Sequence, residues 1–338
     1  MGGNYVTTDG IEADRIDMHK IERDQLTLML GRFVSEVNKL YNFWAPLAII
    51  NREIYSGSGN SLMNYAIGDA DFKRVKPTVG DFDILVPSDR ADDLAKFLTK
   101  YKGRTIEGFT LKGFKLTSTT SISIWHNEDF NLNIQIDWEL ADFDEAGRPT
   151  EFAKFSRSSS WDDLQLGIKG VFSKYLLRAL TTLYLVHGVV PATSSKSKPK
   201  VDLHPTVAFS VDRGLRKKYD VGAVDPTYGV PTLIDPANGE YTKNLADIFK
   251  VLFNGAKPSS AEIKSMSSFD GLLKLIKKYH KNKNDIKKIA DGFTRLLFGP
   301  GAQVLYRNDL ERDKAEKLVA LRYFEKVLPG SIDPKWLS

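Results

Sequence analysis

Residues 79–87 read Val79-Gly80-Asp81-Phe82-Asp83-Ile84-Leu85-Val86-Pro87. Alternating polar and apolar residues, followed by an apolar run and a proline, predict a β-strand that enters a hydrophobic sheet. Because successive side chains of a strand point to opposite faces, Asp81 and Asp83 share one face and Phe82, Ile84 and Val86 share the other. The two carboxylates should lie about 7 Å apart along the strand, within reach of the same divalent cations. Like charges this close repel unless a cation or a proton lies between them.

Two further segments favour a site at this strand. Upstream, Ile54-Tyr55-Ser56-Gly57-Ser58-Gly59-Asn60 is a small-residue turn after an apolar lead-in. Glycines in such a turn let backbone amides approach a ligand, and a helix N-terminus behind it would favour phosphate. Downstream, residues 132–140 alternate over nine positions, and their polar side is Asn133, Gln135, Asp137 and Glu139. A third carboxylate on a neighbouring strand, facing the same way, would complete a two-metal site.

Together, these three segments resemble the nucleotidyltransferase superfamily, which includes DNA polymerase beta, CCA-adding enzymes, poly(A) polymerases and antibiotic nucleotidyltransferases. The likeness covers residues 52–140. It implies an α/β (α+β) fold with a mixed β-sheet and flanking helices, three metal-binding aspartates at Asp81, Asp83 and Asp137, and a triphosphate held by Gly57 and Ser58. The sequence departs from the family pattern in two ways. The spacing from Ser58 to Asp81 is longer than in many members, with an inserted loop at residues 68–78, and the usual Arg or Gly-Thr pair after the turn is missing.

The resemblance implies transfer of a nucleoside monophosphate from an NTP or dNTP to an acceptor hydroxyl, with release of pyrophosphate. Mg²⁺ or Mn²⁺ is the implied cofactor, and Asp137 would ligate the ion that lowers the pKa of the acceptor hydroxyl. Glu139 has two open roles, as acceptor of the proton or as partner of an outer-shell water. By analogy with several branches of the family, Lys169 with Ser173 or Lys174 would hold the triphosphate from a later helix. Lys73, Arg74 and Lys76 of the inserted loop could add positive charge over it.

Each motif also has an ordinary structural interpretation. An Asp-x-Asp pair occurs by chance about once in a chain of this length, and alone it indicates a surface turn. The glycine-serine turn could be a flexible connection. Lysines on a helix flank often extend along an apolar surface to reach solvent. The combination of turn, carboxylate strand and matching second strand is what favours a site over these alternatives.

Composition sets limits on other functions. The chain has 338 residues and no cysteine, so a disulfide, a thiolate nucleophile and a cysteine-based zinc site are excluded. Its five histidines show no close ligand spacing. No apolar run approaches the length of a membrane span, and no secretory signal is apparent at the N-terminus. We therefore expect no membrane association and a cytoplasmic location.

Charge is distributed unevenly along the chain. Residues 1–150 carry 17 Lys and Arg against 23 Asp and Glu, whereas residues 151–338 carry 31 against 20. This division, with the metal ligands in the acidic half, suits an enzyme that acts on a polyanion. The favoured acceptor is a nucleic-acid 3′ end, with RNA or tRNA favoured over DNA. The candidate patch for a phosphate backbone comprises Lys274, Lys277, Lys278, Lys281, Lys287 and Lys288. The alternative is a solvated lysine-rich face.

The sequence predicts three parts. A packing helix occupies residues 1–45 (its pattern runs from about residue 11 to 43), the catalytic domain residues 46–150, and a mainly helical, basic, substrate-binding domain residues 151–338, with a mobile linker near 192–200. In the last part, helices are expected at residues 161–187, 245–253, 268–281, 285–298 and 309–328. Two other functions stay open. One is nucleotidyl transfer to a protein or small molecule, as in toxin and antibiotic-resistance relatives, and the other is a non-catalytic nucleic-acid-binding protein on the same fold.

Overall fold

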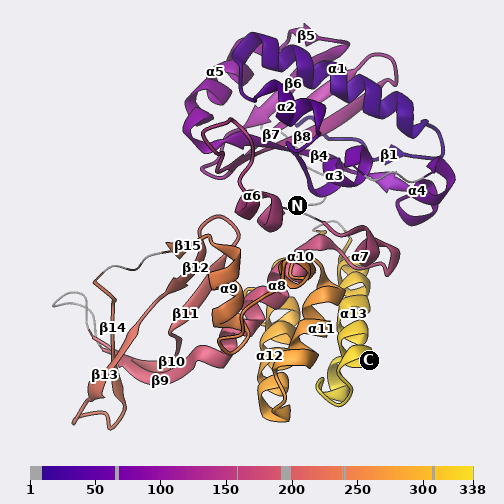
Figure 1. Ribbon diagram of the computed structural model, residues 1–338. Coiled ribbons are helices and arrows are strands. Elements are labelled where there is room, and N and C mark those ends of the chain that lie inside the picture. Colours follow the sequence, from indigo (N-terminus) through magenta and orange to yellow (C-terminus); the bar gives the residue numbers. More distant parts are fainter. Residues whose placement is uncertain are drawn as a thin grey trace. The chain divides into compact units, whose positions relative to one another are not determined.

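The computed structural model describes residues 10–64, 68–157, 159–191, 199–237, 239, 241–306 and 309–337. The chain divides into two compact units, Met1–Gly170 and Val171–Ser338, which are coloured from indigo to yellow along the sequence in Figure 1. The expectation of a mixed α/β protein is confirmed, because helices and mixed sheets alternate along the chain. Among the described residues, none of the helices combines the length and apolar character needed to cross a bilayer.

The first unit is built on a six-stranded sheet with the order β2-β4-β8-β7-β6-β5. β4 and β8 pair in parallel, and the remaining neighbours pair antiparallel. β6 and β7 pair antiparallel, and their register shifts between Leu111 and Gly113. The strands are β2 (Tyr55–Ser56), β4 (Asp81–Pro87), β5 (Thr105–Ile106), β6 (Phe109–Lys115), β7 (Thr120–Asn127) and β8 (Leu132–Ala141).

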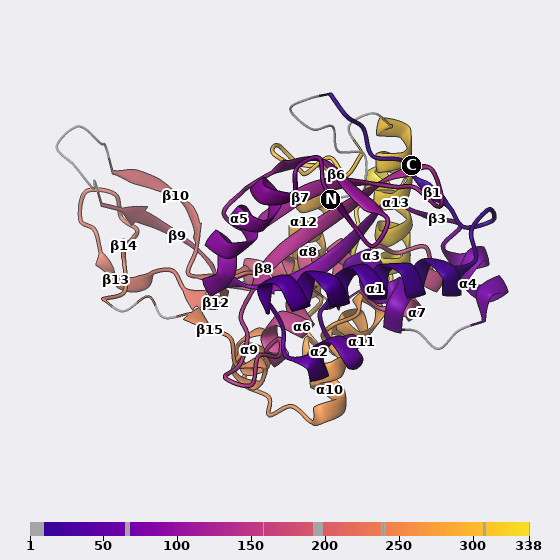
Figure 2. The same ribbon diagram turned by 90° about the horizontal axis from the view of Figure 1, so that it is seen from above.

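The apolar face of this sheet is covered by α1 (Arg23–Tyr41) and α5 (Ala91–Tyr101). Both helices lie over the same face in Figure 1, and Figure 2 looks down on that side. The ring centroids of Phe33 of α1 and Trp125 of β7 are 4.9 Å apart, and those of Phe97 of α5 and Trp138 of β8 are 5.8 Å apart. Both indole N–H groups donate to the Ser123 hydroxyl, at 2.8 and 2.7 Å. Residues predicted to face the core, such as Phe82 and Ile84, do so.

The opposite face of the sheet carries the polar residues of β4 and β8. Near the C-terminal ends of these strands, Leu85 and Ala141 pack with Ala153 of α6 (Glu151–Arg157). The remaining elements of the unit are short: β1 (Ile16–Asp17), α2 (Pro46–Ile50), α3 (Gly57–Asn64), α4 (Asp69–Val75), β3 (Thr78–Val79), η1 (Ser88–Arg90) and α7 (Trp161–Gln165). The two main core helices, α1 and α5, do not cover the face of the sheet that carries the carboxylates.

Two predictions about this unit are wrong. The first helix begins at Arg23 instead of near residue 11, because Ile16 and Asp17 form a strand that pairs with Thr78 and Val79. The expected loop at residues 68–78 contains α4 and β3. Asp69 and Asp71 in the first turn of α4, and Lys73 and Arg74 in its last, suit the helix dipole. The burial of Phe72 anchors this short helix.

A buried arginine joins α1 to α3. The Nε and Nη2 atoms of Arg23 donate to the Leu62 carbonyl at 3.0 and 2.7 Å. Its guanidinium lies 4.8 Å from the centre of the Phe72 ring, and its backbone N–H donates to Asp69 Oδ1 at 3.2 Å. The side chain thus satisfies a carbonyl near the C-terminal end of α3, the helix that follows the glycine turn.

We expect Arg23→Met to lower the free energy of unfolding by about 2–4 kcal/mol, because two charged hydrogen bonds and a cation–π contact are lost and a carbonyl is left without these donors. Arg74→Met is the matched control. Arg74 forms an exposed pair with Asp71, so its loss should cost less than about 1 kcal/mol. Urea unfolding of the three proteins measures both values. Equal effects of the two substitutions would contradict a structural role for Arg23.

The second unit is not wholly helical. Residues 185–242 contain a four-stranded sheet, β10-β9-β14-β13, and a three-stranded sheet, β11-β12-β15. Their strands are β9 (Leu185–Val190), β10 (Lys200–Pro205), β11 (Val207–Ser210), β12 (Gly214–Lys217), β13 (Asp220–Val224), β14 (Pro231–Ile234) and β15 (Tyr241–Thr242). Most of the predicted linker, residues 192–198, lies outside the described residues.

The expected long helix at residues 161–187 is wrong. α7 stops at Gln165, Gly167 takes a φ of 72° that ends the helical path, and α8 (Gly170–Leu180) starts again. β-branched residues then favour β9, which pairs with β10. The later helical elements are η2 (Thr181–Tyr184), α9 (Leu245–Leu252), α10 (Ser260–Ser265), α11 (Phe269–Tyr279), α12 (Lys283–Phe298), α13 (Leu310–Val327) and η3 (Pro334–Trp336). The helices α9, α11, α12 and α13 agree with the expected ranges, whereas α10 and η3 lie outside them.

Candidate metal centre

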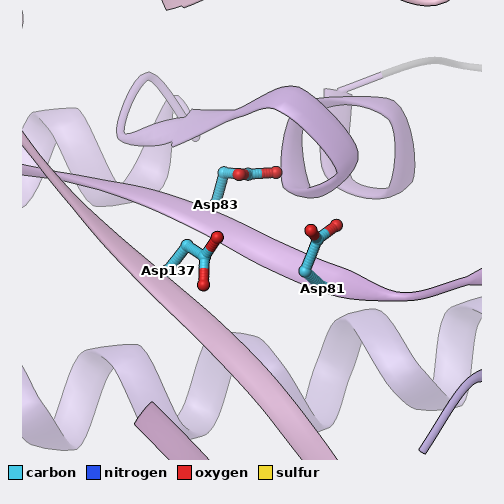
Figure 3. Close-up of side chains that lie close together, drawn as sticks. All are labelled: Asp81, Asp83 and Asp137. Atoms are coloured by element: carbon cyan, nitrogen blue, oxygen red, sulfur yellow. The ribbon is translucent and has the colours of Figure 1, made fainter. Parts of the chain in front are cut away.

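Three aspartates converge on the polar face of the first sheet. Asp81 and Asp83 come from β4 and Asp137 from β8, and one carboxylate oxygen of each lies within 4.8 Å of the others. Figure 3 shows the three carboxylates gathered on one side of the two strands. The parallel register pairs Asp83 directly with Asp137. The side chains are almost fully buried, with 5%, 8% and 2% of Asp81, Asp83 and Asp137 exposed.

Burial and mutual repulsion make these carboxylates hard to ionise together. Burial raises the pKa of Asp83 well above its usual value, and the neighbouring Asp81, Glu139 and Asp137 raise it further. Burial and then Asp81 raise the pKa of Asp137 to about 8, although a hydrogen bond from Gln135 acts in the opposite direction. Such a cluster holds a proton near neutral pH or binds a cation that replaces it.

Hydrogen-bond partners are incomplete within the cluster. Gln135 Nε2 donates to Asp137 Oδ1 at 2.8 Å and so fixes the orientation of that carboxylate. The Oδ2 atom of Asp81 is buried without a hydrogen-bond partner among the described residues. Unpartnered buried carboxylate oxygens are costly, and hard oxygen ligands are those that Mg²⁺ and Mn²⁺ prefer. The residues therefore fit a divalent metal centre.

The glycine turn lies directly against this cluster. Gly57 has a φ of +43°, and a β-carbon placed on it would overlap the Asp83 carboxylate. A β-carbon on Gly59 would lie 2.8 Å from the Asp83 carbonyl oxygen. β2 just before the turn pairs Ser56 with Asp83, which holds the turn in place. Ser58 is the second residue of α3, and its side chain lies outside the described part of the structure.

We expect Gly57→Ala to weaken metal binding at the cluster by at least about tenfold, because the new methyl group forces the Asp83 carboxylate to move, and 1.4 kcal/mol corresponds to tenfold. The strained φ adds a stability cost of about 1 kcal/mol or more. Gly68→Ala is the matched control, since Gly68 has open space around its α-carbon and a φ of −59°. Calorimetric titration with Mn²⁺ measures the difference, and equal affinities would contradict the close contact.

Glu139 is engaged by two partners. The Ser56 hydroxyl donates to Glu139 Oε2 at 2.7 Å, and Arg157 Nη1 donates to Oε1 at 3.2 Å. This pair is largely buried, with 12% of the Arg157 side chain and 16% of the Glu139 side chain exposed. Through these contacts Glu139 joins α6 to the sheet. Ser56 and Arg157 were missed by the sequence reasoning because nothing local links them to Glu139.

The cations of the inserted segment have different environments. Lys73 pairs with Glu22 and Asp69, and Arg74 pairs with Asp71. Burial lowers the pKa of Lys76 to about 8, while the charges of Asp81 and Asp83 oppose that shift and Lys169 adds to it. The charge of Lys76 therefore interacts with those of Asp81, Asp83 and Lys169. Only the tertiary structure shows this interaction, because Lys169 is far in sequence from Lys76 and from the two aspartates.

The other predicted binding residues lie in the second unit. Ser173 and Lys174 are on α8, and both side chains are buried. All six lysines of the predicted phosphate-backbone patch are exposed. Lys274 pairs with Asp270 at 2.5 Å and Lys278 with Glu262 at 2.7 Å, which reduces the net positive charge of the patch. The six are Lys274, Lys277 and Lys278 of α11, Lys281 after it, and Lys287 and Lys288 of α12.

Comparison of the sequence with protein-family models and with curated proteins finds no match.

Proposed function

We propose that this protein is a metal-dependent nucleotidyltransferase with the catalytic fold of that superfamily. One observation carries the proposal: two buried aspartates separated by one residue on β4 meet a third, Asp137, directly across a parallel strand pair. Three carboxylates within 4.8 Å of one another match the donor set needed to clamp the attacking and leaving oxygens of an in-line phosphoryl displacement.

Asp81, Asp83 and Asp137 would hold divalent ions that, when bound, neutralise the triphosphate and lower the pKa of the acceptor hydroxyl. The acceptor oxygen forms a bond to the α-phosphorus, the bond from that phosphorus to the pyrophosphate oxygen breaks, and the hydroxyl proton passes to solvent. Gln135 orients the Asp137 carboxylate through its 2.8 Å hydrogen bond. The glycines at 57 and 59 keep the turn close to Asp83, and Lys76 supplies positive charge beside the phosphates.

The proposed acceptor is a nucleic-acid 3′ end, with RNA favoured. The exposed lysines of α11 and α12 support this choice, because lysines that neutralise phosphates give salt-sensitive, sequence-independent affinity. Retention on RNA should accordingly fall steeply as salt is raised.

The test is incubation with Mg²⁺ or Mn²⁺, each labelled NTP or dNTP, and a mixture of total RNA, primed DNA and cell protein. Label should enter RNA with the intact protein and not with an Asp81→Asn/Asp83→Asn variant whose unfolding curve shows that it folds. Label in protein instead of RNA would move the acceptor to that class. Absence of both transfer and metal-dependent nucleotide binding would overturn the proposal.

A further inference from the structure

A small cavity lies beside the carboxylate cluster in the first unit. It has a volume of about 230 Å³ and is walled by the β2–α3 segment, β4 and α6. The polar residues that matter to its chemistry are Glu53, Ser56, Asn60, Asn64, Lys154 and Arg157. None of them is among the three aspartates, so the cavity is a separate binding space next to the proposed reaction centre.

The strand register gives the position of this cavity. Ser56 lines it and is the pairing partner of Asp83, and Leu85 lines it two residues beyond Asp83 on the same face of β4. Two residues along a strand correspond to about 7 Å. Arg157 also lines the cavity and binds Glu139, which lies two residues beyond Asp137 on β8. The cavity is therefore displaced from the carboxylates by two residues along both strands, β4 and β8.

The charges around the cavity are paired. Lys154 Nζ lies 3.2 Å from Glu53 Oε1, and Arg157 Nη1 lies 3.2 Å from Glu139 Oε1. Since each cation already has a carboxylate, the cavity has little excess charge with which to attract a phosphate. A neutral polar group is the better match for its interior.

One acceptor in the cavity lacks a partner. Glu53 Oε2 is buried and has no hydrogen-bond partner among the described residues, while Oε1 is taken by Lys154. Three carboxamides, those of Asn51, Asn60 and Asn64, line the same space, and Asn64 Nδ2 donates to Asn60 Oδ1 at 2.7 Å. A ligand with hydroxyl groups would donate to the free carboxylate oxygen and exchange hydrogen bonds with the amides.

The volume limits the size of the occupant. Pockets that enclose drug-sized ligands span about 300–1,000 Å³, so this cavity takes part of a nucleotide and not the whole molecule. In a nucleotide, the ribose is the first group beyond the α-phosphate. A carboxylate near the phosphate site is a known means of binding ribose hydroxyls.

We propose that this cavity binds the ribose of the incoming nucleotide, with Glu53 Oε2 accepting from a ribose hydroxyl, so that the protein selects NTP over dNTP. The inference rests on the proposed nucleotidyl transfer. It also assigns Glu53 as a specificity residue that does not touch the reacting atoms. Removing the ligand hydroxyl would leave the buried oxygen unpaired, which is the condition under which a polar site discriminates strongly.

The experiment compares the wild-type protein with Glu53→Gln and Asn64→Leu. Glu53→Gln keeps an oxygen for Lys154 but replaces the free acceptor by an amide, and Asn64→Leu removes hydrogen bonds at an exposed helical position. Thr99→Leu, on the exposed side of α5, is the matched control because α5 packs on the opposite face of the sheet. Equilibrium binding of each NTP, its 2′-deoxy and its 3′-deoxy analogue is measured with Mg²⁺, together with Mn²⁺ affinity in the absence of nucleotide.

The wild-type and Thr99→Leu proteins should bind the NTP at least about tenfold more tightly than one deoxy analogue. Glu53→Gln and Asn64→Leu should reduce that ratio severalfold and leave Mn²⁺ affinity unchanged. An unaltered ratio in both variants, or equal binding of NTP and deoxy analogues by the wild type, would overturn the ribose assignment while nucleotidyl transfer stood. No metal-dependent nucleotide binding by the wild type would remove both proposals.

Discussion

Replacing Asp83 by Asn is expected to reduce nucleotidyl transfer by about 10³-fold or more, because the substitution removes the carboxylate that faces both Asp81 and Asp137. Asparagine preserves the size of the side chain and its contact with the Gly57 turn, so the loss would come from charge and ligand type. The affinity for Mn²⁺ should fall in parallel, and calorimetric titration measures this without any substrate.

The matched control for this substitution is Asp71→Asn. Asp71 lies on α4 of the same unit, with 65% of its side chain exposed, so both transfer and Mn²⁺ affinity should stay within about twofold of wild type. If Asp83→Asn retains wild-type Mn²⁺ affinity and transfer, the aspartates are not the metal centre, and the function proposed from them fails.

The second large effect concerns stability in the absence of metal. With a chelator present, the contribution of Asp137 to the free energy of unfolding of the wild-type protein should fall as the pH rises from about 4 to about 8. The pKa of Asp137 is raised to about 8 in the folded protein, against an ordinary value of about 4 in an unfolded chain. Between these values the folded state holds a proton that the unfolded state has released. Stability from this group is therefore complete at low pH and is lost with a slope of up to about 1.4 kcal/mol per pH unit.

Asp83 acts in the same direction, because its pKa is also raised by burial and by its acidic neighbours. Asp137→Asn should flatten the slope, since asparagine stays neutral and still accepts the hydrogen bond from Gln135. This variant should be more stable than the wild type at pH 8 in chelator, and the difference should shrink toward pH 4. Saturating Mg²⁺ or Mn²⁺ should reverse the order, because a ligand at about 100 times its Kd stabilises the wild type by about 2.7 kcal/mol.

Chemical denaturation from pH 4 to pH 8, with and without metal, measures these changes. Asp129→Asn is the control, since Asp129 is an exposed residue in the turn between β7 and β8 and should leave the slope unchanged. A pH slope that is the same in the wild-type protein and in Asp137→Asn would contradict the raised pKa of Asp137.

The sequence alone predicted the faces of β4 and β8 correctly. Alternation with a period of two is a local property, so the positions of Asp81 and Asp83 opposite Phe82 and Ile84 follow from the strand itself. The same is true of the amphipathic helices, where the expected ranges at residues 245–253, 268–281, 285–298 and 309–328 agree with α9, α11, α12 and α13. Where an element packs through a single apolar face, the local sequence pattern is sufficient to predict that element.

Prediction failed where a second segment was needed. The helix expected at residues 161–187 gives way to β9 because a partner strand, β10, is available to pair with it. The segment at 68–78 becomes a helix and a strand because Phe72 reaches the core and Thr78 and Val79 find β1. Glu139 and Arg157 form an ion pair on the polar face of the sheet. Their spacing in the sequence does not predict this contact.

By itself, the sequence determined which residues could form a metal site and on which face of each strand they lie, because side-chain direction in a strand is set by neighbouring residues along the chain. The tertiary structure decided that β8 pairs with β4 in parallel and in the register that sets Asp137 opposite Asp83. It also decided that the Gly57 turn presses on Asp83 and that a cavity opens beside them. These features depend on contacts between segments that are distant in the sequence. The free energy that forms such contacts comes from burial of the whole core and cannot be assigned to any one segment.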